Sequence, residues 1–283
     1  MTSIPQSTSF SGASTYVLDD ELAQIVNISM ALEMPLLLKG EPGTGKTMLA
    51  HAIAESLGMK LIVLNVKSTM KLVDTLYQYD TLTRLNDSRF GDSNRDVSSI
   101  EDYITMGKIG QAFTSDERVV LLIDEIDKAD SDFQDDMLDI LDQMEFDIIE
   151  TDATVRARHR PVIVITSNAK KDLSEPFLGR CNFHHIAFPD PDMMRRIVRV
   201  HFPDISDELM NSCVRAFYQM RELRSVEKKP ATRELINWIR ALQEDPDFDP
   251  KALKKGDVPY LGVLFKKSGD FELAKNGASR MRW

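Results

Sequence analysis

The apolar positions in the first part of the chain form short continuous runs, separated by stretches with helical spacing. Residues 35–39 and 61–66 each predict a buried strand, and residues 118–123 predict a third. Helical spacing over 18–32 and 47–57 predicts the helices that accompany them. Strands that alternate with helices in this order favour a parallel sheet with crossover helices, and therefore an α/β fold.

The pattern is less regular after the second strand. Residues 67–115 are mixed and polar, and they predict a helix, a long polar loop around 86–96 and another helix. An amphipathic helix is expected over 130–146. It is followed by two short strands around a turn, a β-hairpin over 146–159, and by a further buried strand at 161–166.

The hydrophobic pattern changes near the Pro/Asp segment 189–192. Beyond it the strands stop, and helical periodicity continues at 192–201, 206–224 and 231–243. The uncharged residues 1–15, rich in Ser and Thr, predict a flexible arm. The expected organisation is an arm over 1–15, an α/β domain over 16–188 with a hairpin insertion at 146–159, and an all-helical domain with a C-terminal tail over 189–283.

Charge and cysteine content narrow the function classes. The chain has 45 acidic and 35 basic residues and a net charge of −10, so it is expected to bind nucleic acid poorly. Its 2 cysteines, Cys181 and Cys213, exclude a disulfide scaffold and a four-cysteine zinc site. The N-terminus lacks a secretory signal pattern, and no apolar run approaches the ~20 residues of a membrane helix. A soluble, cytoplasmic protein is expected.

A glycine-rich loop after the first strand carries the strongest chemical signal. Residues 40–47 read GEPGTGKT and match G-x-x-x-x-G-K-[ST] in full. Gly43 and Gly45 allow the backbone N–H groups to face phosphate oxygens, and the following helix directs its positive dipole end at the same place. Lys46 is expected to neutralise the β- and γ-phosphates, and Thr47 to bind Mg²⁺ through its hydroxyl. The predicted nucleotide-binding residues are Gly40, Glu41, Pro42, Gly43, Thr44, Gly45, Lys46, Thr47 and Met48.

Two acids at the end of the third strand complete a predicted Mg²⁺-dependent site for ATP or ADP. The run VVLLIDE over 119–125 is a Walker B pattern, which is weak alone but strong downstream of a complete P-loop. Asp124 is expected to hold Mg²⁺, and Glu125 to be the general base that activates the attacking water. Asn168, at the end of strand 161–166, could orient that water, although Asn is also common in loops. These motifs predict the parallel sheet of a P-loop NTPase.

The order of these motifs, followed by a helical lid, resembles the AAA+ ATPases. The hairpin before the Asn168 strand resembles the pre-sensor insertion of one AAA+ group, and LSEPFLGR at 173–180 resembles a segment of the MoxR-type ATPases. The resemblance implies that Arg180 is an arginine finger that reaches the nucleotide of a neighbouring subunit. It also implies that Arg233 is the sensor 2 contact to the γ-phosphate in cis, and that Asn65 restrains the Walker B glutamate.

Further segments resemble the CoxD-like branch of the MoxR-type ATPases, and the resemblance covers about 15–265. These segments are NVKST at 65–69, LYQYD at 76–80, GQAFTSD at 110–116 and FHHIAFPD at 183–190. The resemblance implies a chaperone that matures the metal centre of molybdenum-containing carbon monoxide dehydrogenase. It also implies a molybdenum hydroxylase precursor as client and a von Willebrand A-domain protein as partner. The chain has Gly-Arg-Cys at 179–181 where MoxR-type proteins more often have Asp-Arg-Phe, so the surroundings of the finger differ.

Two weaker clusters have structural interpretations that we favour. Cys181 with His184 and His185 could suggest a metal site, but adjacent histidines in a strand point to opposite faces, which favours packing or surface roles. A basic cluster on the hairpin could bind nucleic acid, yet it lies beside many acids, which favours contact with a client or a subunit. It consists of Arg156, Arg158, His159 and Arg160.

The leading hypothesis is an AAA+ ring, a hexamer by resemblance, in which Mg²⁺-dependent ATP hydrolysis remodels a client protein. An arginine supplied in trans would make hydrolysis depend on assembly. One alternative is a nucleotide-dependent switch or scaffold that hydrolyses little. Another is a DNA-associated motor, which the acidic balance disfavours. A small-molecule kinase has no use for the Asp-Glu strand and the helical lid.

Overall fold

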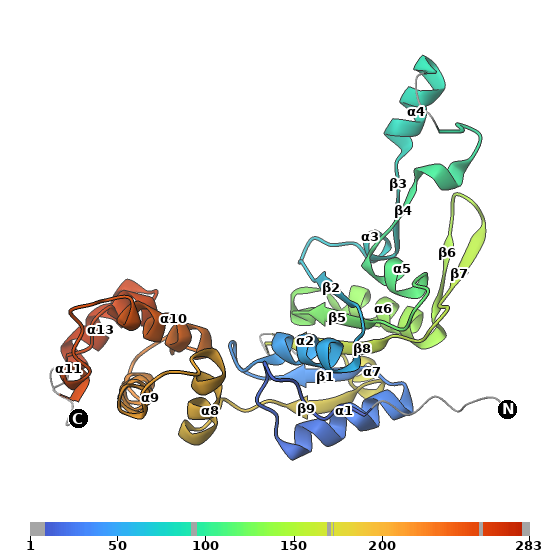
Figure 1. The fold of residues 1–283 in the computed structure, drawn as a ribbon. Helices are drawn as coiled ribbons and strands as arrows, with labels where there is room; N and C mark the ends of the chain where they lie inside the picture. Colours follow the sequence, from blue (N-terminus) through green and yellow to red (C-terminus); the bar gives the residue numbers. More distant parts are fainter. Residues whose placement is uncertain (1–8, 92–94, 169–170, 172, 255–256, 279–283) are drawn as a thin grey trace. The chain divides into compact units, whose positions relative to one another are not determined.

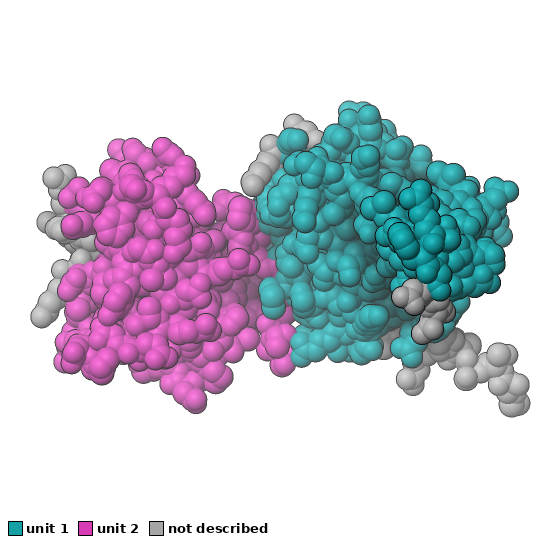
Figure 2. All heavy atoms as spheres, turned by 90° about the horizontal axis from the view of Figure 1, so that it is seen from above, with its two compact units in different colours: residues 1–13, 18–40, 46–186 teal, residues 14–17, 41–45, 187–283 magenta. Residues whose placement is uncertain are grey.

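The chain divides into two compact units, which are coloured separately in Figure 2. The computed structural model describes residues 9–91, 95–168, 171, 173–254 and 257–278. The first unit contains residues 1–13, 18–40 and 46–186, and the second contains 14–17, 41–45 and 187–283. Most of the P-loop therefore groups with the C-terminal unit, although it follows the first strand in sequence.

The first unit is built on a five-stranded sheet in the order β2-β5-β8-β1-β9, in which all neighbours are parallel. Its strands are β1 (Leu36–Lys39), β2 (Leu61–Asn65), β5 (Val120–Asp124), β8 (Val162–Ser167) and β9 (Asn182–His185). The register sets Asn65 beside Asp124 and Leu38 beside Thr166. The carboxyl ends of four strands therefore meet at one edge, where open α/β sheets bind their ligands. The predicted parallel α/β fold is confirmed.

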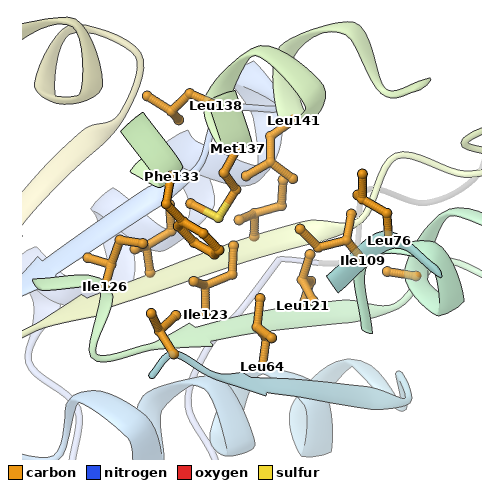
Figure 3. Close-up of a cluster of buried hydrophobic side chains, with 14 of the residues drawn as sticks. Leu64, Leu76, Ile109, Leu121, Ile123, Ile126, Phe133, Met137, Leu138 and Leu141 are labelled. Atoms are coloured by element: carbon orange, nitrogen blue, oxygen red, sulfur yellow. The ribbon is translucent and has the colours of Figure 1, made fainter. Parts of the chain in front are cut away.

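Helices cover both faces of this sheet. Leu64, Leu121 and Ile123 point toward the core formed with α6, which contributes Phe133 and Met137 (Figure 3). Burial of these large side chains supplies most of the favourable free energy of this layer. The helices of this unit are α1 (Asp20–Leu32), α2 (Lys46–Leu57), α3 (Leu72–Leu76), α4 (Thr81–Phe90), α5 (Lys108–Phe113), α6 (Ser131–Gln143) and α7 (Glu175–Gly179), with the 3-10 turns η1 (Ile100–Tyr103) and η2 (Ile126–Lys128).

The segment after β2 differs most from the sequence prediction. β3 (Tyr77–Tyr79) and β4 (Ile104–Met106) form an antiparallel ladder that carries α4 at its far end (Figure 1). Part of the predicted loop at 86–96 is therefore helix, while 92–94 lie outside the described residues. α4 has no buried residue, so it lacks the apolar periodicity that would reveal it. Polar contacts hold it instead: Arg84 donates to the Tyr79 hydroxyl at 2.8 Å, and the Tyr103 hydroxyl donates to Asp87 at 2.9 Å.

The predicted hairpin forms from β6 (Glu145–Ile148) and β7 (Ala153–Arg156), which pair antiparallel. Met144 takes a left-handed conformation, with φ 56°, and this ends α6 before the predicted boundary. The hairpin lies beside the β3–β4 ladder, because the Ile149 N–H donates to the Tyr77 hydroxyl at 3.1 Å and Tyr77 stacks on Phe146. The two insertions therefore support each other.

The described part of the predicted N-terminal arm is anchored. The Phe10 side chain is only 2% exposed, and its backbone N–H and carbonyl both bond to the Asn27 amide, at 2.7 and 2.9 Å. A single aromatic side chain in an otherwise polar segment gives no periodic signal, so the sequence did not reveal this anchor. Residues 1–8 of the predicted arm lie outside the described residues.

The second unit contains the predicted C-terminal helices. Its core surrounds Trp238 and Phe217, both fully buried, and the Trp238 indole N–H donates to the Pro259 carbonyl at 2.8 Å. The helices are α8 (Pro191–His201), α9 (Asp207–Arg221), α10 (Thr232–Gln243), α11 (Lys251–Lys254), α12 (Leu261–Leu264) and α13 (Ser268–Ala278). Across the described residues, no helix combines the length and the apolar character needed to span a membrane.

Candidate nucleotide site

The P-loop has the backbone conformation that its glycines predict. Gly43 and Gly45 have φ values of 81° and 92°, in the left-handed region that glycine enters without steric cost. Thr44 is buried, and its hydroxyl donates to the Glu41 carbonyl at 3.0 Å, which tightens the loop. α2 begins at Lys46, directly after the loop. Its first N–H groups and the positive end of its dipole therefore favour an anion such as a phosphate group.

The residues that follow the loop connect it to the Walker B strand. The buried Lys46 ammonium donates to the Gly40 carbonyl at 2.9 Å. The Thr47 hydroxyl donates to Oδ1 of Asp124 at 2.9 Å, so both predicted Mg²⁺ ligands lie within one hydrogen bond. A hydroxyl and a carboxylate are hard oxygen donors, which Mg²⁺ prefers.

Few protein ligands surround this position. Among the described residues, no group of three or more His, Cys, Asp and Glu side chains could hold a metal ion by itself. Mg²⁺ usually keeps several waters and binds through one or two protein groups together with substrate phosphates. The Thr47–Asp124 pair therefore fits a nucleotide-bound Mg²⁺ rather than a metal cage made entirely of protein.

Glu125 is held on two sides. The Asn168 amide donates to Oε1 of Glu125 at 2.9 Å, and Lys128 forms an ion pair with Oε2. The hydrogen bond with Glu125 is the main cause that raises the pKa of Lys128, so the ammonium stays charged at neutral pH. The Glu125 backbone has φ 60°, which is uncommon for a residue with a side chain. The predicted general base Glu125 and the predicted water-orienting residue Asn168 are thus within hydrogen-bond distance of each other.

Asn65 is the residue that, by the resemblance, restrains the Walker B glutamate. It is exposed at the end of β2 and pairs in register with Asp124. Asn168 and Lys128 contact the Glu125 carboxylate. Sequence reasoning missed Lys128, although its spacing of three residues from Glu125 in a single turn could have indicated the contact.

Arg180 lies at the end of α7 and contacts acids of its own chain. Its guanidinium is 3.4 Å from Asp139 and 2.9 Å from Asp142, both on α6, and its side chain is 40% exposed. These two acids of α6 therefore bind a cation of their own chain as well as facing solvent. Ion pairs at such exposure are individually weak, so Arg180 can change partner at small cost.

The N-terminus of α10 lies against the P-loop within the second unit. A Cβ added to Gly43 would come 2.5 Å from the Ala231 Cβ. Arg233 is exposed two residues further along, in the first turn of α10.

A second link joins the P-loop to the helices of that unit. Arg221 of α9 is buried, and one of its amines is 3.1 Å from the Glu41 carboxylate. Its guanidinium also stacks on the Phe188 ring, 3.4 Å from the centroid, and bonds to the Pro230 carbonyl. Sequence reasoning missed Arg221, because nothing in the pattern separates it from the other arginines of the helical domain.

Substitution of Gly43 by alanine is expected to lower the affinity for ADP at least ~10-fold, because a Cβ would strain the loop that is predicted to face the phosphates. Gly58→Ala is the matched control. Gly58 also has a positive φ, 63°, but nothing lies within 4 Å of an added Cβ. The Gly58→Ala variant should lose about 1 kcal/mol of folding stability and bind ADP with the wild-type affinity. Calorimetric titration with ADP and thermal unfolding measure both effects. Equal affinities for the two variants would contradict this interpretation of the loop.

The weaker metal hypothesis gains no support from the structure. Burial, followed by the neighbouring Asp142 charge, raises the pKa of Cys181 to about 12. Metal binding requires the thiolate, which is scarce at such a pKa. Cys181, His184 and His185 form no three-residue metal group in the described part of the chain.

Both thiols are expected to react slowly with a disulfide reagent in the native protein at pH 8. Burial also raises the pKa of Cys213 to about 12, against 9.0 for an ordinary thiol. The reactive thiolate should therefore be roughly 10³-fold scarcer than in a free cysteine. Timed labelling before and after denaturation, with Cys213→Ser to assign the sites, measures this. Rapid labelling of the folded protein would show that the thiols are not buried in solution.

Comparison with solved structures finds the same fold. No curated protein matches the sequence. RuvB, the Holliday junction branch migration motor of Thermotoga maritima, has a TM-score of 0.53 at 16% identity, over 88% of this chain and 71% of RuvB. NtrX from Brucella abortus, solved in complex with ADP, has a TM-score of 0.56 at 15% identity, over 91% of this chain and 56% of NtrX. At these identities the likeness concerns the fold alone.

The sequence itself matches a family across the whole parallel sheet. Residues 36–189, more than half of the 283, match the profile of the ATPase family associated with various cellular activities. The matched segment contains the P-loop, the Walker B acids, Asn168 and Arg180. The chain belongs to this AAA family.

Proposed function

We propose that this protein hydrolyses ATP with Mg²⁺ and uses the energy to remodel another protein. The observation that carries the proposal is the 2.9 Å hydrogen bond from Thr47 to Asp124, which joins the P-loop helix to the Walker B strand. Glu125 and Asn168 lie next to this pair. This geometry supports a site in which metal ligands and a water-activating base share the carboxyl edge of one sheet.

Each residue has a role in the proposed reaction. Lys46 would bind the β- and γ-phosphates, and Thr47 and Asp124 would hold the metal. When bound, Mg²⁺ neutralises charge that develops on the phosphate oxygens. Glu125 takes the proton of the attacking water, and the Asn168 amide orients the base through its hydrogen bond. The other oxygen of Glu125 forms the ion pair with Lys128.

Assembly supplies the remaining charge in this proposal. Arg180 reaches the γ-phosphate of a neighbouring subunit in a ring, which is hexameric by the family resemblance. Arg233 contacts the γ-phosphate of its own subunit's nucleotide. The exposure of both side chains supports these roles, since each must be free to approach a ligand. Hydrolysis then becomes conditional on neighbouring subunits.

The client is proposed from the sequence segments that resemble the CoxD-like MoxR-type ATPases. It is a molybdenum hydroxylase precursor, specifically carbon monoxide dehydrogenase before its metal centre is complete, and a von Willebrand A-domain protein assists. Co-purification of this chain with the metal-free precursor, dependent on ATP, would support this. Binding that ignores both ATP and the metal state of the precursor would argue against it.

Steady-state hydrolysis as a function of protein concentration tests the ATPase. We expect specific activity to rise with concentration, to vanish with EDTA, and to be lost in Lys46→Ala, which removes the phosphate-binding ammonium. If the protein binds ATP but turns over nothing at any concentration, it is a nucleotide-dependent switch instead. Stimulation by duplex DNA would favour a DNA-associated motor, which the net charge of −10 disfavours.

A further inference from the structure

Thr166 lies near the carboxyl end of β8, the central strand of the five-stranded sheet. Its side chain makes hydrogen bonds that burial in a strand does not require. This side chain is 1% exposed. The hydroxyl donates to Oδ1 of Asp124 at 2.6 Å and accepts from the backbone N–H of Glu125 at 2.9 Å. One oxygen atom therefore contacts both Walker B residues. A valine would fill the same space in a strand, so packing alone gives no reason for the hydroxyl.

The first contact concerns the metal ligand. Two hydroxyls, those of Thr47 and Thr166, converge on Oδ1 of Asp124. A lone pair of the Thr47 oxygen would be available to a metal, and the Thr166 hydroxyl would hold the same Asp124 carboxylate from a second side. Outer hydrogen bonds of this kind orient a ligating carboxylate, and their removal typically lowers metal affinity.

The second contact concerns the base. Glu125 has φ 60°, a left-handed conformation that is sterically unfavourable for a residue with a Cβ. Its N–H lies in this turn and finds its acceptor in the Thr166 hydroxyl. A buried N–H without an acceptor is costly, so loss of the hydroxyl would favour a different turn and a displaced carboxylate.

We infer that Thr166 is a positioning residue, which sets the metal ligand Asp124 and the base Glu125 in one fixed relation. This inference rests on the proposed ATPase function and adds a residue to it. Thr166 acts through the two acids that its hydroxyl contacts. The competing interpretation is that Thr166 is an ordinary buried hydroxyl whose bonds only satisfy its own polarity.

Thr166→Val and Thr166→Ser separate these interpretations, because valine keeps the shape and serine keeps the hydroxyl. We expect Thr166→Val to lower kcat about 10- to 100-fold, because the free energy of a hydrogen bond to a charged group corresponds to a rate change of that size. The Mg²⁺ concentration at half-maximal rate should rise several-fold, whereas KM for ATP at saturating Mg²⁺ stays near the wild-type value. Thr166→Ser should recover most of both losses.

Thr154→Val is the matched control. The Thr154 hydroxyl also donates to a carboxylate, Oδ1 of Asp147 at 2.7 Å, but on the exposed hairpin. The same chemical change there should leave kcat and the Mg²⁺ dependence unchanged. Should Thr166→Val fail to fold, Thr166→Ala against Thr166→Ser isolates the hydroxyl between two small side chains, and the same difference is expected.

The inference is overturned if the variants with and without the hydroxyl agree in kcat and in Mg²⁺ dependence. Binding of Mn²⁺ to the ADP-loaded protein, followed by electron paramagnetic resonance, provides a readout that needs no turnover. Thr166→Val should bind Mn²⁺ several-fold more weakly, with Mg²⁺-free ADP affinity unchanged. If wild type hydrolyses nothing, the proposed ATPase fails, while the Mn²⁺ comparison still decides whether Thr166 positions Asp124.

Discussion

Replacing Arg180 with alanine is expected to reduce ATP turnover by roughly 10³-fold or more, because an arginine finger contributes ~10³–10⁵ to the rate in related chemistry. The loss should appear in kcat. Affinity for ADP should stay near the wild-type value, since ADP lacks the phosphate that the finger contacts. Arg215→Ala, at an exposed position of α9, is the control and should hydrolyse ATP normally.

A mixing experiment shows whether Arg180 acts on its own nucleotide or on a neighbour's. Arg180→Ala subunits keep Glu125, and Glu125→Gln subunits keep Arg180. In a ring with a finger in trans, the two inactive proteins should regain activity when combined, because some boundaries then contain both intact groups. If Arg180 acts in cis, the mixture stays inactive, and the dependence of hydrolysis on assembly needs another explanation.

Substitution of Glu125 by glutamine is expected to lower kcat ~10²–10⁴-fold, the range for loss of a general base. Glutamine keeps the size of the side chain and can still accept the bond that Asn168 donates at 2.9 Å. It has no charge, so the ion pair with Lys128 is lost as well. Nucleotide binding, measured by titration with a fluorescent ATP analogue, should therefore remain while turnover in a phosphate-release assay falls.

Glu145→Gln provides the comparison for this loss. Glu145 also forms an ion pair, with Arg156 at 2.8 Å, but on the exposed hairpin. Its substitution should leave turnover within about two-fold, since exposed pairs contribute little. If Glu125→Gln retained most of the wild-type kcat, Glu125 would not be the base, and another acid or a solvent relay would have to take the proton.

The sheet and the P-loop could be predicted because their signals are local. Apolar runs at 61–66 and 118–123 need only length and composition to indicate buried strands, and GEPGTGKT carries its own backbone requirements. The ladder under α4 could not be predicted in this way. Its strands have three residues each, and its helix buries none, so polar contacts made across the sequence determine the structure.

The side-chain contacts within the candidate site could not be predicted from local sequence either. Asp124 and Glu125 follow from the pattern of one strand, yet the partners of Glu125 depend on which strands become neighbours. β5 pairs with both β2 and β8, so Asn65 and Asn168 were equally placed to reach the base from sequence alone. The structure brings Asn168 to it, together with Thr166, which resembles any other β-branched residue in a buried strand.

In the proposed ring, the two acids beside Arg180 would make the position of this side chain depend on whether the neighbouring subunit holds ATP or ADP. Asp139 and Asp142 offer the guanidinium an anionic environment within its own chain. A γ-phosphate in the neighbouring subunit must compete with these carboxylates. The free energy gained when Arg180 moves to the phosphate is therefore only the difference between two ion pairs. After hydrolysis that competitor is gone, and the balance returns to the carboxylates. Arg180 would then contact the neighbouring subunit when ATP is bound there and its own acids when ADP is bound. The interface between subunits would therefore strengthen and weaken once in every hydrolysis cycle.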